Sequence, residues 1–233
     1  MDMERYGDYN EYEEDLPKSK NPILLVIKIL IIVVCVAVAG VLIFRVAFFN
    51  FYPKSIKNLY FDEKLTEYYE ASGGNISVKT QKIRAKYDDN KVAKFFCDNL
   101  YVIDEISQLQ LSIRYTNTSI DHIEKEFSLS GLDPKDPELF TYKLACWSDE
   151  AQSIVYLDAS VVPVQYETKL MYHYYKLVCN NVPMGGLNQP SWLRLEVFVK
   201  GREEKIAQIC VYENHNEYST FENYELKSED KPK

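Results

Sequence analysis

The sequence predicts a mainly β protein in which a single N-terminal transmembrane helix precedes an antiparallel β-sandwich with one short helix. Three observations support this fold class. A single apolar run of membrane-spanning length lies near the N-terminus. Short segments of alternating polarity, separated by polar turns, fill most of the remaining chain. These segments do not alternate with long helical patterns, which argues against a parallel nucleotide-binding sheet.

The first element is an acidic tail, residues 1–21, which has almost no apolar side chains to bury and is therefore expected to be disordered. Residues 22–52 form the predicted transmembrane helix, because the stretch 29–44 carries no charge. About 20 apolar residues span a bilayer as a helix. The apolar run continues well past the small residues at 37–39, so we expect an uncleaved signal-anchor rather than a cleaved signal peptide.

Five residues near the ends of the predicted helix are expected to anchor it at the membrane surfaces. Long basic side chains can extend from a span to the lipid headgroups, and aromatic rings gather at the same level. The predicted anchor residues are Lys28, Arg45, Phe48, Phe49 and Tyr52. The lipid bilayer is therefore the first expected partner of this chain.

The charges that flank the span do not decide its orientation. Three basic residues lie on each side of the apolar stretch: Lys18, Lys20 and Lys28 before it, and Arg45, Lys54 and Lys57 after it. Long domains translocate largely regardless of such charges. The strand-rich, tyrosine-rich character of the C-terminal part is typical of an extracytoplasmic module. We therefore expect a single-pass protein of the cell membrane with an extracytoplasmic C-terminal domain.

Residues 53–74 are expected to form a juxtamembrane linker or stalk, and residues 75–213 the β-sandwich. The clearest half-buried strand is 109–115, where apolar residues alternate with Gln, Ser and Arg. A short helix is predicted at 119–127, capped by Thr118 or Ser119. The other predicted strands are 92–97, 100–103, 140–147, 153–158, 166–179, 193–199 and 206–212. The acidic end, residues 214–233, is expected to be disordered.

The predicted sandwich has an immunoglobulin-like architecture but lacks the pattern of the true immunoglobulin family. That family places a tryptophan soon after its first cysteine and a tyrosine two positions before its second. Here Trp147 lies far beyond Cys97, and Leu177 occupies the position two residues before Cys179. We therefore predict an immunoglobulin-like architecture but not membership of the immunoglobulin family.

Four cysteines lie after the span: Cys97, Cys146, Cys179 and Cys210. An even number of cysteines in an extracytoplasmic domain allows disulfides whose pairing the spacing does not decide. All four also lie in apolar strand-like runs, where buried free cysteine is common. Both alternatives stay open. The absence of a C-x-x-C motif and of histidines at ligand spacing argues against zinc, and no cofactor is predicted.

Composition and motifs exclude several classes of function. The net charge of −8 and the lack of a clustered basic face argue against a nucleic-acid partner. No serine-hydrolase, zinc-protease or phosphate-binding motif is present, so no catalytic residue is predicted. A Cys179–His173 nucleophile pair and a calcium loop at 133–138 are weaker interpretations than strand packing and a solvated turn.

An aromatic group near a glycine-containing loop is the predicted binding surface. Its members are Tyr172, Tyr174, Met184 and Trp192. Aromatic rings on an exposed sheet could stack on a glycan or grip a protein, although alternate rings of one strand also fill cores. We therefore expect a membrane-anchored, non-catalytic binding module with a protein or glycan partner. A membrane-tethered hydrolase and an accessory subunit of a membrane complex are the alternatives.

Overall fold

The computed structural model describes residues 22–49, 52–83, 87–88, 92–148, 150–183, 192–213 and 221–231. The contacts divide the chain into two compact units, Met1–Phe51 and Tyr52–Lys233. The predicted N-terminal acidic tail lies outside the described residues. The second unit therefore begins at Tyr52, one residue before the predicted linker.

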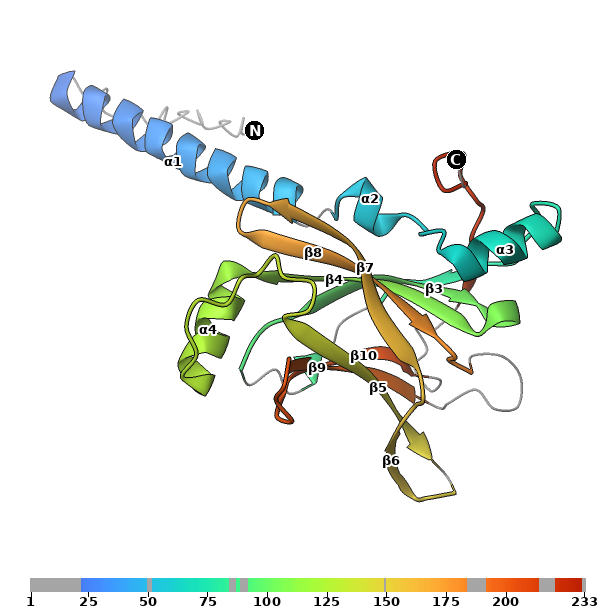
Figure 1. Cartoon of the computed structure of the whole chain (residues 1–233). Coiled ribbons are helices and arrows are strands. Elements are labelled where there is room, and N and C mark those ends of the chain that lie inside the picture. Colours follow the sequence, from blue (N-terminus) through green and yellow to red (C-terminus); the bar gives the residue numbers. More distant parts are fainter. Residues whose placement is uncertain are drawn as a thin grey trace, which may run out of the picture. The chain divides into compact units, whose positions relative to one another are not determined.

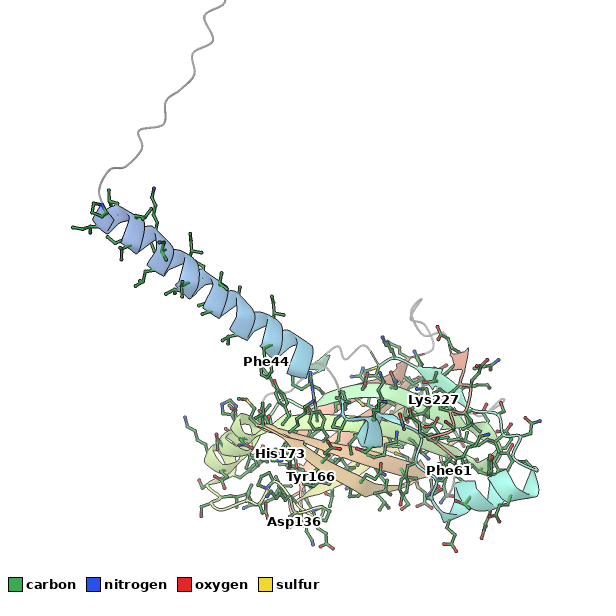
Figure 2. The ribbon with its side chains drawn as sticks, turned by 90° about the horizontal axis from the view of Figure 1, so that it is seen from above. Phe44, Phe61, Asp136, Tyr166, His173 and Lys227 are labelled. Atoms are coloured by element: carbon green, nitrogen blue, oxygen red, sulfur yellow. The ribbon has the colours of Figure 1, made fainter. Side chains whose placement is uncertain are left out.

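The first unit contains one long helix, α1 (Pro22–Phe49). Its side chains from Pro22 to Phe44 are exposed on every side of the helix (Figure 2), and the helix is long and apolar enough to cross a membrane. The prediction of a helix over 22–52 extends past the observed end at Phe49. Pro53 disfavours helical backbone at the residue before it. Four predicted anchor residues, Lys28, Arg45, Phe48 and Phe49, lie on α1.

The described strands of the second unit form two antiparallel sheets (Figure 1). In spatial order, the six-stranded sheet contains β11 (Glu222–Asn223), β1 (Lys79–Gln81), β3 (Phe96–Ile103), β4 (Gln108–Thr116), β8 (Tyr172–Asn180) and β7 (Ser160–Lys169). The five-stranded sheet contains β2 (Tyr87–Asp88), β10 (Lys205–Glu213), β9 (Trp192–Val199), β5 (Phe140–Ser148) and β6 (Ser153–Tyr156). The mainly β prediction is confirmed.

Three α-helices and one 3-10 turn accompany the described strands: α2 (Lys54–Lys57), α3 (Glu63–Ala71), α4 (Asn117–Phe127) and η1 (Asp104–Ile106). Asp62 caps α3, and its side chain accepts a hydrogen bond from the Leu65 N–H. Thr116 caps α4 in a reciprocal capping box with Ser119. The predicted cap at Thr118 or Ser119 is therefore two or three residues too late.

One apolar core receives side chains from both sheets. After β4 the chain forms hairpins that alternate between the sheets: β5–β6 in the five-stranded sheet, β7–β8 in the six-stranded sheet, and β9–β10 back in the five-stranded sheet. Leu111 and Leu177 enter the core from the six-stranded sheet, and Leu144, Leu195 and Ile209 from the five-stranded sheet. Burial of these side chains supplies the main driving force for folding.

The prediction of one long strand over 166–179 is wrong. β7 and β8 occupy this region as a tight hairpin, and the last paired residues are Lys169 and Tyr172. The two residues between them, Leu170 and Met171, make the turn, and Leu170 has a φ of 55°. Turns of this kind usually carry Gly or Asn, because these residues tolerate positive φ. The turn was missed because the sequence shows neither residue there.

The C-terminal segment differs from the predicted disordered tail. Residues 214–220 lie outside the described residues, but 221–231 pack against the six-stranded sheet, where β11 pairs with β1. The Tyr224 hydroxyl and the Lys227 N–H both donate to Asp230, at 2.7 and 2.9 Å. The Tyr224 ring meets the Tyr101 ring at 5.0 Å. These contacts order a segment whose acidic composition alone predicts disorder.

Candidate functional site

A row of polar side chains on β4 is buried on the outer face of the six-stranded sheet. Gln108, Gln110 and Ser112 are 1%, 0% and 0% exposed, respectively. They alternate with Leu109 and Leu111, which face the core between the sheets. The prediction of a half-buried strand is therefore wrong for β4, because both of its faces are covered. We call these three side chains the polar row.

Residues 52–62, which we call the juxtamembrane segment, cover the polar row. The side chains of the polar row form hydrogen bonds with backbone groups of this segment and with the Asp62 side chain. The Gln110 amide donates to the Tyr60 carbonyl at 2.6 Å and accepts from the Tyr60 N–H at 2.8 Å. The Ser112 hydroxyl donates to the Ile56 carbonyl at 2.6 Å. Gln108 donates to the Asp62 carboxylate at 2.8 Å. Each buried polar group named here thus has a partner, as burial requires.

Buried apolar side chains also hold the juxtamembrane segment and the start of α3 against the domain. Ile56, Leu59 and Leu65 are buried. Leu59 and Leu65 join a second, smaller apolar cluster with Tyr101 and Ile103 of β3. The Tyr101 hydroxyl also donates to the Lys57 carbonyl at 2.9 Å. The chain from Tyr52 onward is therefore part of the folded domain.

Tyr52 belongs to this domain, although the sequence indicated a membrane anchor. Its hydroxyl donates to the Phe96 carbonyl at 3.2 Å, and its ring meets the Tyr174 ring edge to face at 5.3 Å. The Arg114 guanidinium carbon lies 5.4 Å from the Tyr52 ring, 4.8 Å from Phe96 and 5.3 Å from Tyr172. Cations are attracted to aromatic faces at such distances. Burial raises the pKa of the Tyr52 phenol.

Lys176 of β8 is a buried amine next to the polar row. It is 0% exposed, and its Nζ atom makes no hydrogen bond to the described part of the chain. The atom lies 4.6 Å from the centroid of the Tyr101 ring. Burial lowers the pKa of Lys176 to about 7, and the opposing effects of Asp230, Cys97 and Asp98 are smaller. This amine can therefore lose its proton near neutral pH while the domain stays folded.

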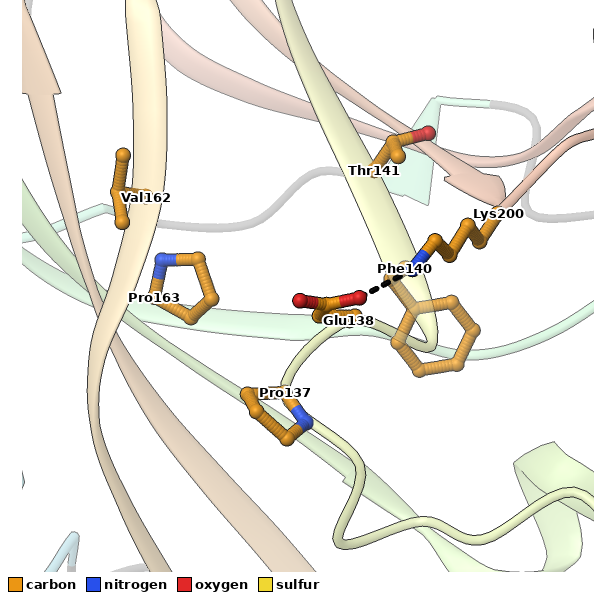
Figure 3. A pocket seen from close by; sticks show the side chains of 7 residues that line it. All are labelled: Pro137, Glu138, Phe140, Thr141, Val162, Pro163 and Lys200. Carbon is orange, nitrogen blue, oxygen red and sulfur yellow. Dashed lines mark hydrogen bonds and ion pairs between the residues drawn. The ribbon is translucent and has the colours of Figure 1, made fainter.

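An open pocket of about 460 Å³ lies beside β5 and β7 (Figure 3). It is lined by Pro137, Glu138, Phe140, Thr141, Val162, Pro163 and Lys200. Glu138 and Lys200 form an ion pair at the pocket, which lowers the pKa of the Glu138 carboxyl and raises that of the Lys200 ammonium. Apolar walls with a few polar groups are typical of ligand pockets. We treat this pocket as the candidate binding site.

The loop that leads to this pocket is the predicted calcium loop. The Asp133 carboxylate accepts the Lys135 N–H at 2.9 Å, and the Asp136 carboxylate accepts the Glu138 N–H at 2.8 Å. Both aspartates thus close local turns. No group of metal-ligating side chains occurs among the described residues.

His173 is buried and hydrogen-bonded on both ring nitrogens. Its Nε2 atom meets the side-chain amide oxygen (Oδ1) of Asn117, which can only accept, so Nε2 carries the proton. Its Nδ1 atom therefore accepts from the Tyr166 hydroxyl at 2.9 Å (Figure 2 labels both side chains). Burial lowers the pKa of His173, in agreement with a neutral ring. His173 and Cys179 lie six positions apart on β8, about 20 Å along a strand, so they form no catalytic pair.

The structure brings two of the predicted binding residues together, because the ring centroids of Tyr172 and Tyr174 lie 6.2 Å apart, whereas Trp192 lies on the other sheet. Tyr172 and Tyr174 lie on the six-stranded sheet, and Tyr174 is completely buried. Trp192 begins β9 of the five-stranded sheet, where the Arg194 guanidinium lies 4.9 Å from its ring. Met184 lies outside the described residues. Sequence reasoning missed the pocket because its residues come from segments that are distant along the chain.

The four cysteines predicted to allow disulfides form none in the structure. Cys97, Cys146 and Cys179 are buried, and Cys210 is half-buried. Burial raises the pKa of the Cys97 and Cys179 thiols, the latter to about 12. Burial thus favours the neutral thiol over the reactive thiolate at both positions.

The chain matches no protein-family model, no curated protein sequence and no solved structure.

Replacement of Gln110 by leucine tests the attachment of the juxtamembrane segment. The variant leaves the Tyr60 N–H and C=O groups unpaired beneath the sheet, which costs about 1–3 kcal/mol. We expect faster hydrogen–deuterium exchange over residues 54–60 than in the wild type. Gln208→Leu, on the five-stranded sheet, is the matched control and should leave that exchange unchanged. Equal exchange in Gln110→Leu and the wild type would contradict this assignment.

Replacement of Lys176 by methionine tests the buried amine. The pKa of Lys176 is lowered to about 7 in the folded state, so above pH 7 the unfolded chain binds more protons than the folded chain. The free energy of unfolding of the wild type should therefore rise between pH 7 and 9, by about 2–3 kcal/mol from this residue. Urea denaturation in detergent at pH 7, 8 and 9 measures it. Lys176→Met should lose this rise, whereas Lys143→Met, at an exposed site, should keep it.

Proposed function

We propose that this chain is a single-pass membrane-anchored protein that presents a non-catalytic, extracytoplasmic β-sandwich binding domain. The observation that carries the proposal is α1, whose residues from Pro22 to Phe44 are apolar except for Lys28 and are exposed on every side. An apolar helix without an apolar surrounding is strongly unfavourable in water. A bilayer supplies that surrounding.

The sandwich assignment is supported by the single core that both antiparallel sheets share. Alternation of hairpins between two sheets is the connectivity expected when each hairpin buries one face against the other sheet. We extend the proposal to an immunoglobulin-like architecture without membership of the immunoglobulin family.

Binding rather than catalysis is supported by the chemistry of the pocket. Four of its lining residues are apolar: Pro137, Phe140, Val162 and Pro163. Its carboxylate, Glu138, is already paired with Lys200. The described lining contains neither a histidine nor a thiol, and the buried His173 is fully occupied by its two partners. A protein or glycan segment with an apolar group and a polar edge fits this surface.

An extracytoplasmic location is part of the proposal. The flanking basic residues are balanced, and a long C-terminal domain can translocate regardless of them. The cell membrane is the proposed site. The lipid bilayer is the proposed first partner, and nucleic acid is excluded from the proposal because the chain carries a net charge of −8.

Charged residues placed in α1 test the anchor. We expect Val33→Arg combined with Val36→Arg to move the full chain from the carbonate-resistant membrane fraction to the supernatant. Each arginine costs about 2.5–3.5 kcal/mol at the centre of a span. Ile154→Arg combined with Val162→Arg, at exposed sites of the domain, is the matched control and should stay in the membrane fraction. Retention of the α1 variant in the carbonate pellet would reject the anchor.

A photoreactive amino acid at Val162 tests the pocket. In native membranes we expect a discrete crosslinked adduct, because this side chain is exposed and lines the pocket. Lys200→Glu reverses the charge of the ion pair and should reduce the adduct several-fold. The same amino acid at Ile154, which is also exposed, should not give this adduct. Identical crosslinking from both positions, or no effect of Lys200→Glu, would contradict a specific site.

A further inference from the structure

The turn between β7 and β8 exposes two adjacent apolar side chains. Leu170 is 63% exposed and Met171 49%. Leu170 also has a φ of 55°, in the left-handed region where Gly and Asn are preferred over branched side chains. The backbone conformation disfavours a leucine at 170, and exposure to water disfavours apolar side chains at both positions. Their presence is therefore not explained by the folding of the hairpin.

This turn lies at the end of the six-stranded sheet where the chain enters the domain. Tyr172 directly follows Met171, and the centroid of its ring is 5.3 Å from the Arg114 guanidinium carbon. The centroid of the Tyr52 ring is 5.4 Å from the same carbon. Tyr52, at the start of the domain, and Tyr172, at the end of the hairpin turn, thus both contact the Arg114 guanidinium.

The covalent chain keeps this end of the sheet near the membrane. Tyr52 follows Phe49, the last residue of α1, by three positions. At no more than about 3.6 Å per residue, the two Cα atoms lie within about 11 Å of each other. This step rests on the proposed function, in which α1 spans the bilayer. The surface of the bilayer is then within reach of Tyr52 and of the turn beside it.

We propose that Leu170 and Met171 insert into the lipid boundary of the bilayer that α1 spans, as a second membrane contact of the domain. Two apolar side chains would bind a membrane weakly by themselves. The tether makes the contact intramolecular and raises its effective concentration, so weak insertion is sufficient. The chain has a net charge of −8, so the contact depends on apolar side chains rather than on anionic lipid.

The second contact restricts the height of the candidate pocket above the membrane. Val162 lies eight positions before Leu170 along β7, which corresponds to about 26 Å of strand. With the turn held at the lipid boundary, the pocket is presented no farther than about this distance from the membrane.

A fluorescent amino acid with a dansyl group tests the contact in the full chain, reconstituted in phosphatidylcholine vesicles. The probe replaces Met171 in one protein and Ile154, an exposed apolar residue on β6, in a matched control. We expect blue-shifted emission at 171 and several-fold stronger quenching by lipids with brominated acyl chains than at 154. Equal emission and quenching at the two positions would overturn the proposal. A blue shift at 171 without bromolipid quenching would also overturn it, because a protein surface would then cover the turn.

A probe at Val36 separates this proposal from the anchor on which it rests. Quenching at 36 together with the absence of quenching at 171 rejects the turn contact and leaves the span intact. Absence of quenching at both positions rejects the span itself. Leu170→Asn combined with Met171→Gly supplies residues that favour a tight turn, so this variant should fold. Trypsin should cleave it after Lys169 several-fold faster than the wild type in vesicles, and at the wild-type rate in detergent. Equal cleavage rates in vesicles would contradict the insertion.

Discussion

Burial of the polar row on β4 is the constraint on which the outer half of the domain depends. Gln108, Gln110 and Ser112 cannot lose water without hydrogen-bond partners. The juxtamembrane segment supplies them: the Asp62 carboxylate for Gln108, and backbone groups for Gln110 and Ser112. The same hydrogen bonds stabilise the segment, because its Tyr60 N–H and C=O groups pair with the Gln110 amide rather than with a neighbouring strand. A side-chain amide here performs the part that a neighbouring strand performs elsewhere in a sheet.

This arrangement shortens the connection between α1 and the domain. An independent linker of about twenty residues would be flexible. Here the chain is attached to the sheet from Tyr52 onward, through the Phe96 carbonyl and the Arg114 guanidinium. The domain therefore begins within three residues of the end of α1.

The C-terminal segment covers the same outer face from the other end of the sheet. Asp230 is buried there, and it is the carboxylate with the largest effect on the buried Lys176 amine. Tyr101 contacts both the juxtamembrane segment and the C-terminal segment, because its hydroxyl donates to the Lys57 carbonyl while its ring packs against Tyr224. The inner core between the sheets is separate from this region and is built from apolar side chains of both sheets. The outer face therefore combines polar contacts with a buried amine that makes no hydrogen bond to the described residues.

The sequence by itself determined the apolar helix, the mainly β class and most strands, because these follow from local periodicity: the alternation in β9 and the apolar run of α1 are visible without any partner. Only the tertiary structure decided the rest. By sequence, the glutamines of β4 look like surface residues, but in the structure the juxtamembrane segment covers them. By sequence, the acidic end looks like a disordered tail, but in the structure Tyr224 and Asp230 form contacts that order it against the sheet. The Leu170–Met171 turn carries no turn residue, so only the pairing of its two strands reveals it. The candidate pocket joins residues from 137 to 200, and no local pattern encodes a contact between segments so distant along the chain.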